Sequence, residues 1–168
     1  MLGDASVGKT SLTIRYVSGV FLADLKLTIG VDFYSKNIQW KENKIKLQIW
    51  DFGGEERFRF LLPQYCRGAN GAFFLYDITN QITLDHLPDW TQIIREKAGD
   101  VPIVLVGSKL DLNEFRAVPR EDGLLTAKMY NLSAFIEVSS KTGENVEKAF
   151  KSLMESVYKK NNRSKEQE

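Results

Sequence analysis

The chain has 168 residues, of which 43% are hydrophobic and 27% charged, and its formal net charge is +1. This length suits one domain with a full core, and a nearly neutral chain has no general attraction for nucleic acid. The single cysteine, Cys66, excludes an internal disulfide, and no Cys/His spacing could build a metal cage. No apolar run is long enough to span a bilayer, so we expect a cytoplasmic protein. From its charge, we expect no nucleic-acid partner.

The first segment with a chemical signature is a glycine-rich loop. Residues Gly3 to Thr10 match the pattern G-x-x-x-x-G-K-[ST]. In such a loop, backbone N–H groups surround the β-phosphate of a nucleotide, the lysine reaches the β- and γ-oxygens, and the hydroxyl binds Mg²⁺. A chance turn is disfavoured because an amphipathic helix follows. The residues expected to bind the nucleotide here are Asp4, Ala5, Ser6, Val7, Gly8, Lys9, Thr10 and Ser11.

Hydrophobic periodicity predicts an alternation of strands and helices along the rest of the chain. The expected helices cover residues 8–19, 85–98, 120–130 and 145–159. The expected strands cover residues 31–40, 44–51, 71–77, 101–107 and 134–138. The first two strands alternate and form a hairpin, whereas the runs at 71–77 and 101–107 are continuously apolar, as in parallel strands buried on both faces.

The strand that should precede the glycine-rich loop is short. Only Met1 and Leu2 come before Gly3, yet such a strand lies in the middle of its sheet and pairs with two neighbours. We expect a doubly wound α/β domain with a mostly parallel six-stranded sheet, helices on both faces and a truncated first strand. We also expect the natural product to begin several residues earlier. The domain should cover residues 1–160, and residues 161–168 should form a polar, frayed tail.

The second hairpin strand ends in the motif D-x-x-G, at Asp51 to Gly54. The motif places a carboxylate beside the glycine-rich loop, where Mg²⁺ needs an outer ligand. Mg²⁺ keeps several of its waters, so we expect Asp51 to hold one of them. The N–H of Gly54 is available to a γ-phosphate.

In these motifs the chain resembles the small GTPases of the Ras superfamily, and among them the Rab family, over nearly its whole length. The stretches that carry the resemblance are T-I-G-V-D-F at 28–33, K-L-Q-I-W-D at 46–51, E-R-F-R at 56–59, Y-C-R-G-A at 65–69 and L-Y-D-I-T at 75–79. The resemblance implies a P-loop NTPase G domain that binds GTP or GDP with Mg²⁺. It also implies that Thr28 binds Mg²⁺ through its hydroxyl and the γ-phosphate through its N–H, which orders switch I (22–29) and switch II (53–65).

The resemblance extends to the residues that read the base. The S-K-L-D sequence at 108–111 is similar to the family's N-K-x-D, and S-S-K at 139–141 is similar to its S-A-K loop. A carboxylate at Asp111 can accept from N1–H and the 2-amino group of guanine, a donor pair that adenine lacks. Ser108 replaces asparagine and is too short to bridge base and loop in the usual way, so we expect guanine specificity with lower affinity. The residues implied in base binding are Phe21, Ser108, Lys109, Asp111, Ser139, Ser140 and Lys141; for Phe21 the alternative is a core contact.

The sequence departs from the family pattern at one position expected to act in catalysis. The residue after D-x-x-G is usually a glutamine that orients the attacking water, and here it is Glu55. A carboxylate can accept a hydrogen bond from that water, but the γ-phosphate repels it unless a positive group lies nearby. We hypothesise that Glu55 remains competent with a changed pH dependence; an ordinary exposed charge is the alternative. The residues expected to act in hydrolysis are Lys9, Thr28, Gly54 and Glu55.

Partners are implied by the same resemblance. The aromatic residues Phe33, Trp50 and Tyr65 match the effector-binding triad, although they could instead fill the sheet edge. No arginine lies between the first helix and Thr28, so we expect slow turnover controlled by an activating protein, with exchange factors and effectors also bound through the switches. The sequence shows no lipidation motif, so we expect no lipid anchor, and peripheral membrane association remains open. We also expect a monomer. We expect His86 to be a surface residue.

Two other functions remain open from the residues alone. A guanine-nucleotide-binding scaffold that does not hydrolyse GTP would be consistent with Glu55 and Ser108. A P-loop kinase or ATPase is disfavoured, because Asp111 has no role with adenine.

Overall fold

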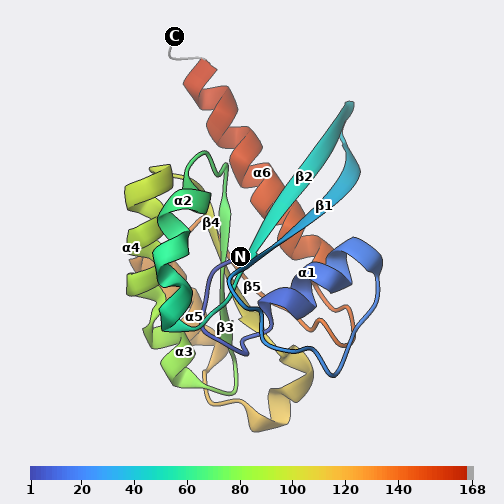
Figure 1. The fold of residues 1–168 in the computed structure, drawn as a ribbon, viewed down its shortest axis with the longest axis vertical. Helices are drawn as coiled ribbons and strands as arrows, with labels where there is room; N and C mark the ends of the chain where they lie inside the picture. Colours follow the sequence, from blue (N-terminus) through green and yellow to red (C-terminus); the bar gives the residue numbers. More distant parts are fainter. Residues whose placement is uncertain (166–168) are drawn as a thin grey trace.

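The computed structural model describes residues 1–165, in which a three-stranded sheet lies between two layers of helices and a two-stranded hairpin extends beside it (Figure 1). The strands are β1 (Val31–Trp40), β2 (Asn43–Phe52), β3 (Ala72–Asp77), β4 (Ile103–Ser108) and β5 (Ala134–Glu137). The helices are α1 (Lys9–Ser18), α2 (Leu62–Cys66), α3 (Gln81–Asp85), α4 (Leu87–Ala98), α5 (Arg120–Met129) and α6 (Val146–Lys165), with short 3₁₀ helices η1 (Glu56–Leu61) and η2 (Leu110–Phe115). Within this part of the chain no helix is long and apolar enough to cross a membrane.

The sheet differs from the expected six strands. Strands β1 and β2 form an antiparallel hairpin, and β3, β4 and β5 form a separate parallel sheet. Between them lie only Met1 and Leu2: Leu2 makes one parallel bridge to Phe74, and the Met1 ammonium donates to the carbonyl of Trp50 at 2.7 Å. Five strands are found among the described residues, so the six-stranded sheet is not confirmed, because two residues cannot form a continuous ladder between β2 and β3. Met1 and Leu2 occupy the place of the first strand, which was expected to be truncated.

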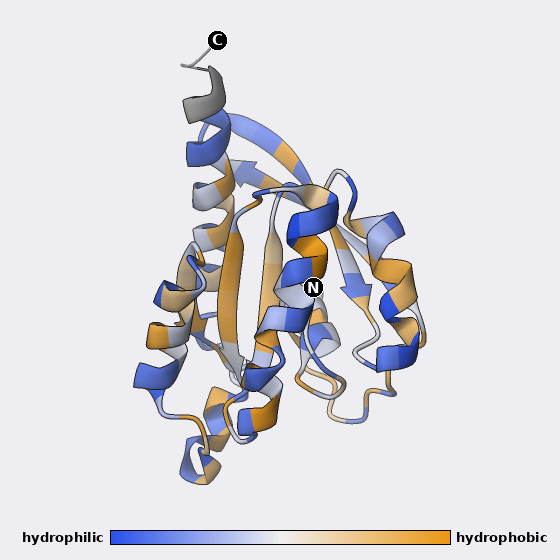
Figure 2. Cartoon of the chain, turned by 90° about the vertical axis from the view of Figure 1, so that its left-hand side faces the viewer, coloured by the Kyte–Doolittle hydropathy of each residue, from blue (hydrophilic) through white to orange (hydrophobic). Residues whose placement is uncertain are grey.

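The parallel sheet is buried on both faces, as its apolar sequence predicts. Every residue of β3 and β4 is buried, and successive side chains of β3 point to opposite faces. Phe73 and Leu75 pack in the core beneath α1 and α6, whereas Phe74 and Tyr76 pack in the core beneath α2 to α5. Figure 2 shows this arrangement as mostly hydrophobic central strands flanked by helices that contain both hydrophilic and hydrophobic residues.

Several element boundaries differ from the sequence-based expectation. Helix α1 ends as predicted, with Gly8 and Gly19 as its caps. The helix expected at 85–98 is α4, which begins at Leu87 with Pro88 in its first turn, and the short helix α3 before it was not expected. Helix α6 continues to Lys165, beyond the expected end at residue 159; of the tail expected at 161–168, residues 166–168 lie outside the described residues.

The segment between β2 and β3 also contains structure that the periodicity does not predict. It folds into η1 and α2, and α2 ends at Cys66, whose side chain is buried beneath it. Burial raises the pKa of the Cys66 thiol. The chain's one cysteine is thus a packing residue, as the sequence suggested.

Replacing a core aromatic residue tests this packing. Phe74 has no exposed surface, so Phe74→Ala should lower the free energy of unfolding by about 3–5 kcal/mol through lost burial and the cavity left behind. The matched control is Phe115→Ala, at a side chain that is 70% exposed, which should change it by less than about 0.5 kcal/mol. Urea unfolding of both variants measures the difference, and equal effects would contradict the assignment of the core.

Candidate functional site

The glycine-rich loop joins Leu2 to α1, and its lysine is buried within it. Lys9 is only 5% exposed, and its ammonium donates to the carbonyl oxygens of Gly3 at 2.8 Å and Asp4 at 2.6 Å. Burial lowers the pKa of Lys9 to about 8. A buried cation held only by neutral carbonyls is electrostatically suited to an anionic ligand, and phosphate oxygens are stronger acceptors for it.

Three oxygen-bearing side chains converge beside Lys9. The Thr10 hydroxyl donates to Asp51 Oδ2 at 2.5 Å and lies 2.8 Å from the Thr28 hydroxyl, which is itself 3.5 Å from the same carboxylate oxygen. Asp51 is fully buried, and its Oδ1 has no hydrogen-bond partner. Burial raises the pKa of Asp51, although the hydrogen bond from Thr10 opposes this. Hard oxygen donors with one unpaired carboxylate oxygen fit Mg²⁺ and its bound waters.

The D-x-x-G segment approaches both the loop and the residues around Thr28. A Cβ on Gly54 would lie 2.1 Å from the carbonyl carbon of Asp4, and a Cβ on Gly53 would lie 2.6 Å from the carbonyl oxygen of Thr28. The N–H of Gly53 also donates to Gly30 at 2.7 Å. These close approaches require glycine at both positions, since a side chain would separate the three segments. The paired glycines therefore allow these contacts.

Glu55 follows at the rim of the same site, beside a positive group. The Arg57 guanidinium lies 2.8 Å from one of its carboxylate oxygens and donates to the other at 3.2 Å. The pair is partly solvent-exposed, so it offsets the charge of Glu55 without fixing it rigidly. A positive group beside it would reduce the repulsion between the Glu55 carboxylate and a γ-phosphate.

The segment at 108–111 is fixed by contacts that the sequence does not reveal. The Ser108 hydroxyl lies 2.5 Å from the Val7 carbonyl and 2.8 Å from the Tyr76 carbonyl, so this short side chain does contact the glycine-rich loop. Lys109 has a left-handed backbone conformation, and its ammonium pairs with Asp77 at 2.5 Å. The Ser139 hydroxyl donates to Asp111 at 2.6 Å and orients this exposed carboxylate.

One cavity of about 320 Å³ joins these parts. The expected site residues that line it are Ala5, Ser6, Gly8, Lys9, Thr10, Ser11, Phe21, Thr28, Gly54, Glu55, Ser108, Lys109, Asp111, Ser140 and Lys141. Four expected residues do not line it and support it from behind: Asp4, Val7, Asp51 and Ser139. The lining residues that the sequence analysis did not assign to the site are Leu22, Ala23, Leu25, Lys26, Leu27, Phe52 and Leu112. The first five lie in the irregular segment expected to be switch I.

The aromatic triad comes from three elements, with Phe33 on β1, Trp50 on β2 and Tyr65 on α2. The rings of Phe33 and Trp50 are 4.8 Å apart, and those of Trp50 and Tyr65 are 5.1 Å apart. Phe33 and Trp50 remain 48% and 37% exposed. A contiguous aromatic surface of this kind is typical of a protein–protein contact.

The fold and the site define a P-loop nucleotide-binding domain of the G-domain type. A family model described as the Ras family matches residues 1–159, and the chain belongs to that family. It is 42% identical to the GTP-binding protein ypt3 of Schizosaccharomyces pombe over 160 residues, which cover 95% of this chain and 74% of the relative. It is also 42% identical to human Ras-related protein Rab-8B (97% and 79% covered) and 40% identical to Arabidopsis thaliana RABA4b (94% and 70% covered). The chain is thus a Rab-like small GTPase of the Ras superfamily, as the sequence motifs indicated.

The Ser108 contacts can be tested directly. The single hydroxyl proton of Ser108 is shared between the buried carbonyls of Val7 and Tyr76. Ser108→Ala removes this donor, so it should lower the free energy of unfolding by about 1–3 kcal/mol and speed GDP release. Ser133→Ala, at an exposed serine, is the control and should change stability by less than about 0.5 kcal/mol. Urea unfolding and release of a fluorescent GDP measure both. An unchanged Ser108→Ala variant would show that Ser108 does not support the loop.

Proposed function

We propose that this protein is a molecular switch that binds GTP with Mg²⁺ and hydrolyses it slowly to GDP. The observation that carries the proposal is the single cavity in which Lys9, the hydroxyls of Thr10 and Thr28, and Asp111 meet. Its phosphate end has a buried cation and hard oxygen ligands, and its base end has an oriented carboxylate. Only a ligand with a polyphosphate and a guanine-like donor edge uses both ends.

In this proposal each phosphate-end residue has a distinct role. Lys9 leaves its loop carbonyls for the β- and γ-oxygens, Thr10 and Thr28 bind Mg²⁺ directly, and Asp51 holds one of its waters. When bound there, Mg²⁺ would supply positive charge to offset that of the phosphates. The N–H groups of Thr28 and Gly54 bind the γ-phosphate, so its loss releases both segments.

Glu55 is proposed to position the attacking water. Its carboxylate can accept a hydrogen bond from water, and Arg57 offsets the repulsion that a γ-phosphate would otherwise exert on it. No arginine lies between α1 and Thr28, so turnover stays slow until a partner supplies one. Effectors are proposed to bind through switch I, switch II and the exposed rings of Phe33 and Trp50.

A single-turnover experiment tests hydrolysis. Protein loaded with GTP and Mg²⁺ should convert the bound nucleotide to GDP over hours, and Glu55→Ala should slow this about 100-fold if the carboxylate positions the water. Glu55→Gln should change the pH profile, because an amide does not titrate. Conversion that is identical in all three proteins would refute the role of Glu55, and GTP that stays intact in the wild type would favour a non-hydrolysing scaffold. Competition by excess ATP, if effective, would refute guanine specificity.

Removal of the buried carboxylate tests the metal site. Asp51→Asn should lower the affinity of the nucleotide complex for Mg²⁺ by about 10–100-fold, as for other residues that orient a metal. In the wild type, a chelator should accelerate GDP release, whereas in Asp51→Asn release should already be fast and respond little to the chelator. The control is Asp85→Asn, at an exposed acid outside the cavity. A wild type insensitive to the chelator would argue against a Mg²⁺-dependent site.

A further inference from the structure

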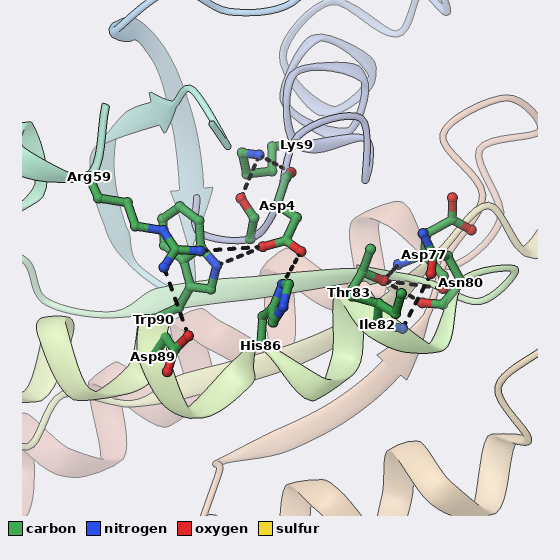
Figure 3. A network of polar contacts seen from close by, with 11 residues as sticks. Asp4, Lys9, Arg59, Asp77, Asn80, Ile82, Thr83, His86, Asp89 and Trp90 are labelled. Carbon is green, nitrogen blue, oxygen red and sulfur yellow. Dashed lines mark hydrogen bonds and ion pairs between the residues drawn. The ribbon is translucent and has the colours of Figure 1, made fainter. Parts of the chain in front are cut away.

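A second polar cluster lies on the outer side of the glycine-rich loop. Figure 3 shows the Asp4 side chain directed away from the loop, toward Arg59, His86 and Trp90. Asp4 does not line the nucleotide cavity, and the proposed function assigns no role to its carboxylate. The cluster therefore needs a separate explanation.

Two residues of the α3–α4 region fix the orientation of Asp4. The indole N–H of Trp90 donates to Oδ1 at 3.0 Å, and Nδ1 of His86 lies 2.6 Å from Oδ2. Trp90 is only 1% exposed, so its N–H needs a protein partner, and Asp4 provides it. His86, expected to be a surface residue, is partly buried and bound to the loop.

The same carboxylate faces an arginine of switch II. The Arg59 guanidinium lies 3.9 Å from Asp4 Oδ1, 3.8 Å from Asp89 Oδ2 and 4.8 Å from the Trp90 ring that it covers. Its side chain is 24% exposed, and its Nε is buried without a partner. Arg59 belongs to η1, so this part of switch II rests on α4 and on the loop together.

The backbone of Asp4 makes the other connections. Its carbonyl oxygen accepts from the Lys9 ammonium at 2.6 Å, and its peptide group touches Gly54, where a Cβ would lie 2.3 Å from that oxygen. One residue thus contacts the phosphate-binding lysine, the glycine at the start of switch II and the arginine further along it. A movement of the loop at this point displaces both contacts with switch II.

We propose that Asp4 is a positioning residue that couples the glycine-rich loop to switch II through Arg59. This inference rests on the proposed function. A nucleotide whose phosphates are bound by the backbone N–H groups of the loop holds the loop, and with it the Asp4 peptide, in place. The Asp4 carboxylate then holds η1 against the loop. With η1 held, the Gly54 segment stays closed over the loop and slows release of the nucleotide.

A double-mutant cycle on GDP release tests the coupling in the full chain. Asp4→Asn keeps the shape of the side chain and an acceptor for Trp90 but removes the charge that faces Arg59, and Arg59→Gln removes the other partner. Each should speed release of a fluorescent GDP by about two- to fivefold, as for a partly exposed ion pair. The double variant should be no faster than the faster single variant, because both act through one interaction. Effects that multiply in the double variant would overturn the proposal.

Asp89→Asn is the matched control. Asp89 is the other carboxylate near Arg59, but it lies on α4 and does not touch the loop. GDP release should therefore be unchanged in this variant. An acceleration equal to that of Asp4→Asn would show that docking of switch II on α4, and not on the loop, sets the release rate, and the proposal would fail.

Hydrogen exchange across residues 56–61 gives a second readout that separates coupling from simple destabilisation. GDP binding should increase protection of this segment in the wild type and change it much less in Asp4→Asn; equal increases would contradict the coupling. The control measurement is GDP binding itself. A wild type that retains no GDP refutes the proposed function. If the wild type retains GDP but the effects of the two substitutions multiply in the double variant, only the role of Asp4 is refuted.

Discussion

The contacts that hold the glycine-rich loop determine where every other part of the site can lie. Lys9 binds the carbonyls of Gly3 and Asp4, and Ser108 binds that of Val7, so the loop is held through its acceptors. In a planar peptide the N–H points away from the C=O, which leaves donors of the same loop for an anion. The loop residues Ala5, Ser6 and Gly8 line the cavity accordingly. The cluster of Thr10, Thr28 and Asp51 is then placed by contact with this loop, and so is switch II.

The parallel sheet supplies the second constraint by bringing distant residues to one edge. Strands β3 and β4 pair in register from Ala72 opposite Ile103 to Asp77 opposite Ser108. Their burial on both faces fixes this register, because a slip would expose apolar residues or bury polar ones. The carboxyl ends of both strands therefore meet beside the loop, and Asp77 reaches Lys109 across the strand ends. In open α/β sheets, ligands bind at this edge for the same reason.

The sequence predicted those features that depend on local pattern. The bounds of β1, the caps of α1 and the buried strands β3 and β4 follow from periodicity and glycine placement, and the loop motif located the phosphate end of the cavity. It could not predict contacts between residues far apart in the chain. Asp4 and His86 are 82 positions apart, and the pairing of Asp77 with Lys109 requires the register of two strands. The sixth strand is not confirmed, because Met1 and Leu2 make a single parallel bridge where the motif implied a strand.

The burial of Cys66 has a consequence for how movement of this molecule can be observed. Its sulfur is the only thiol in the chain, lies at the end of α2 and is shielded by the same helix that follows η1. Because the sulfur is buried, a thiol reagent reaches it only when local opening exposes it, so its reaction rate reports the frequency of that opening. The wild-type chain therefore carries a built-in chemical probe next to switch II, and no cysteine has to be introduced or removed to use it.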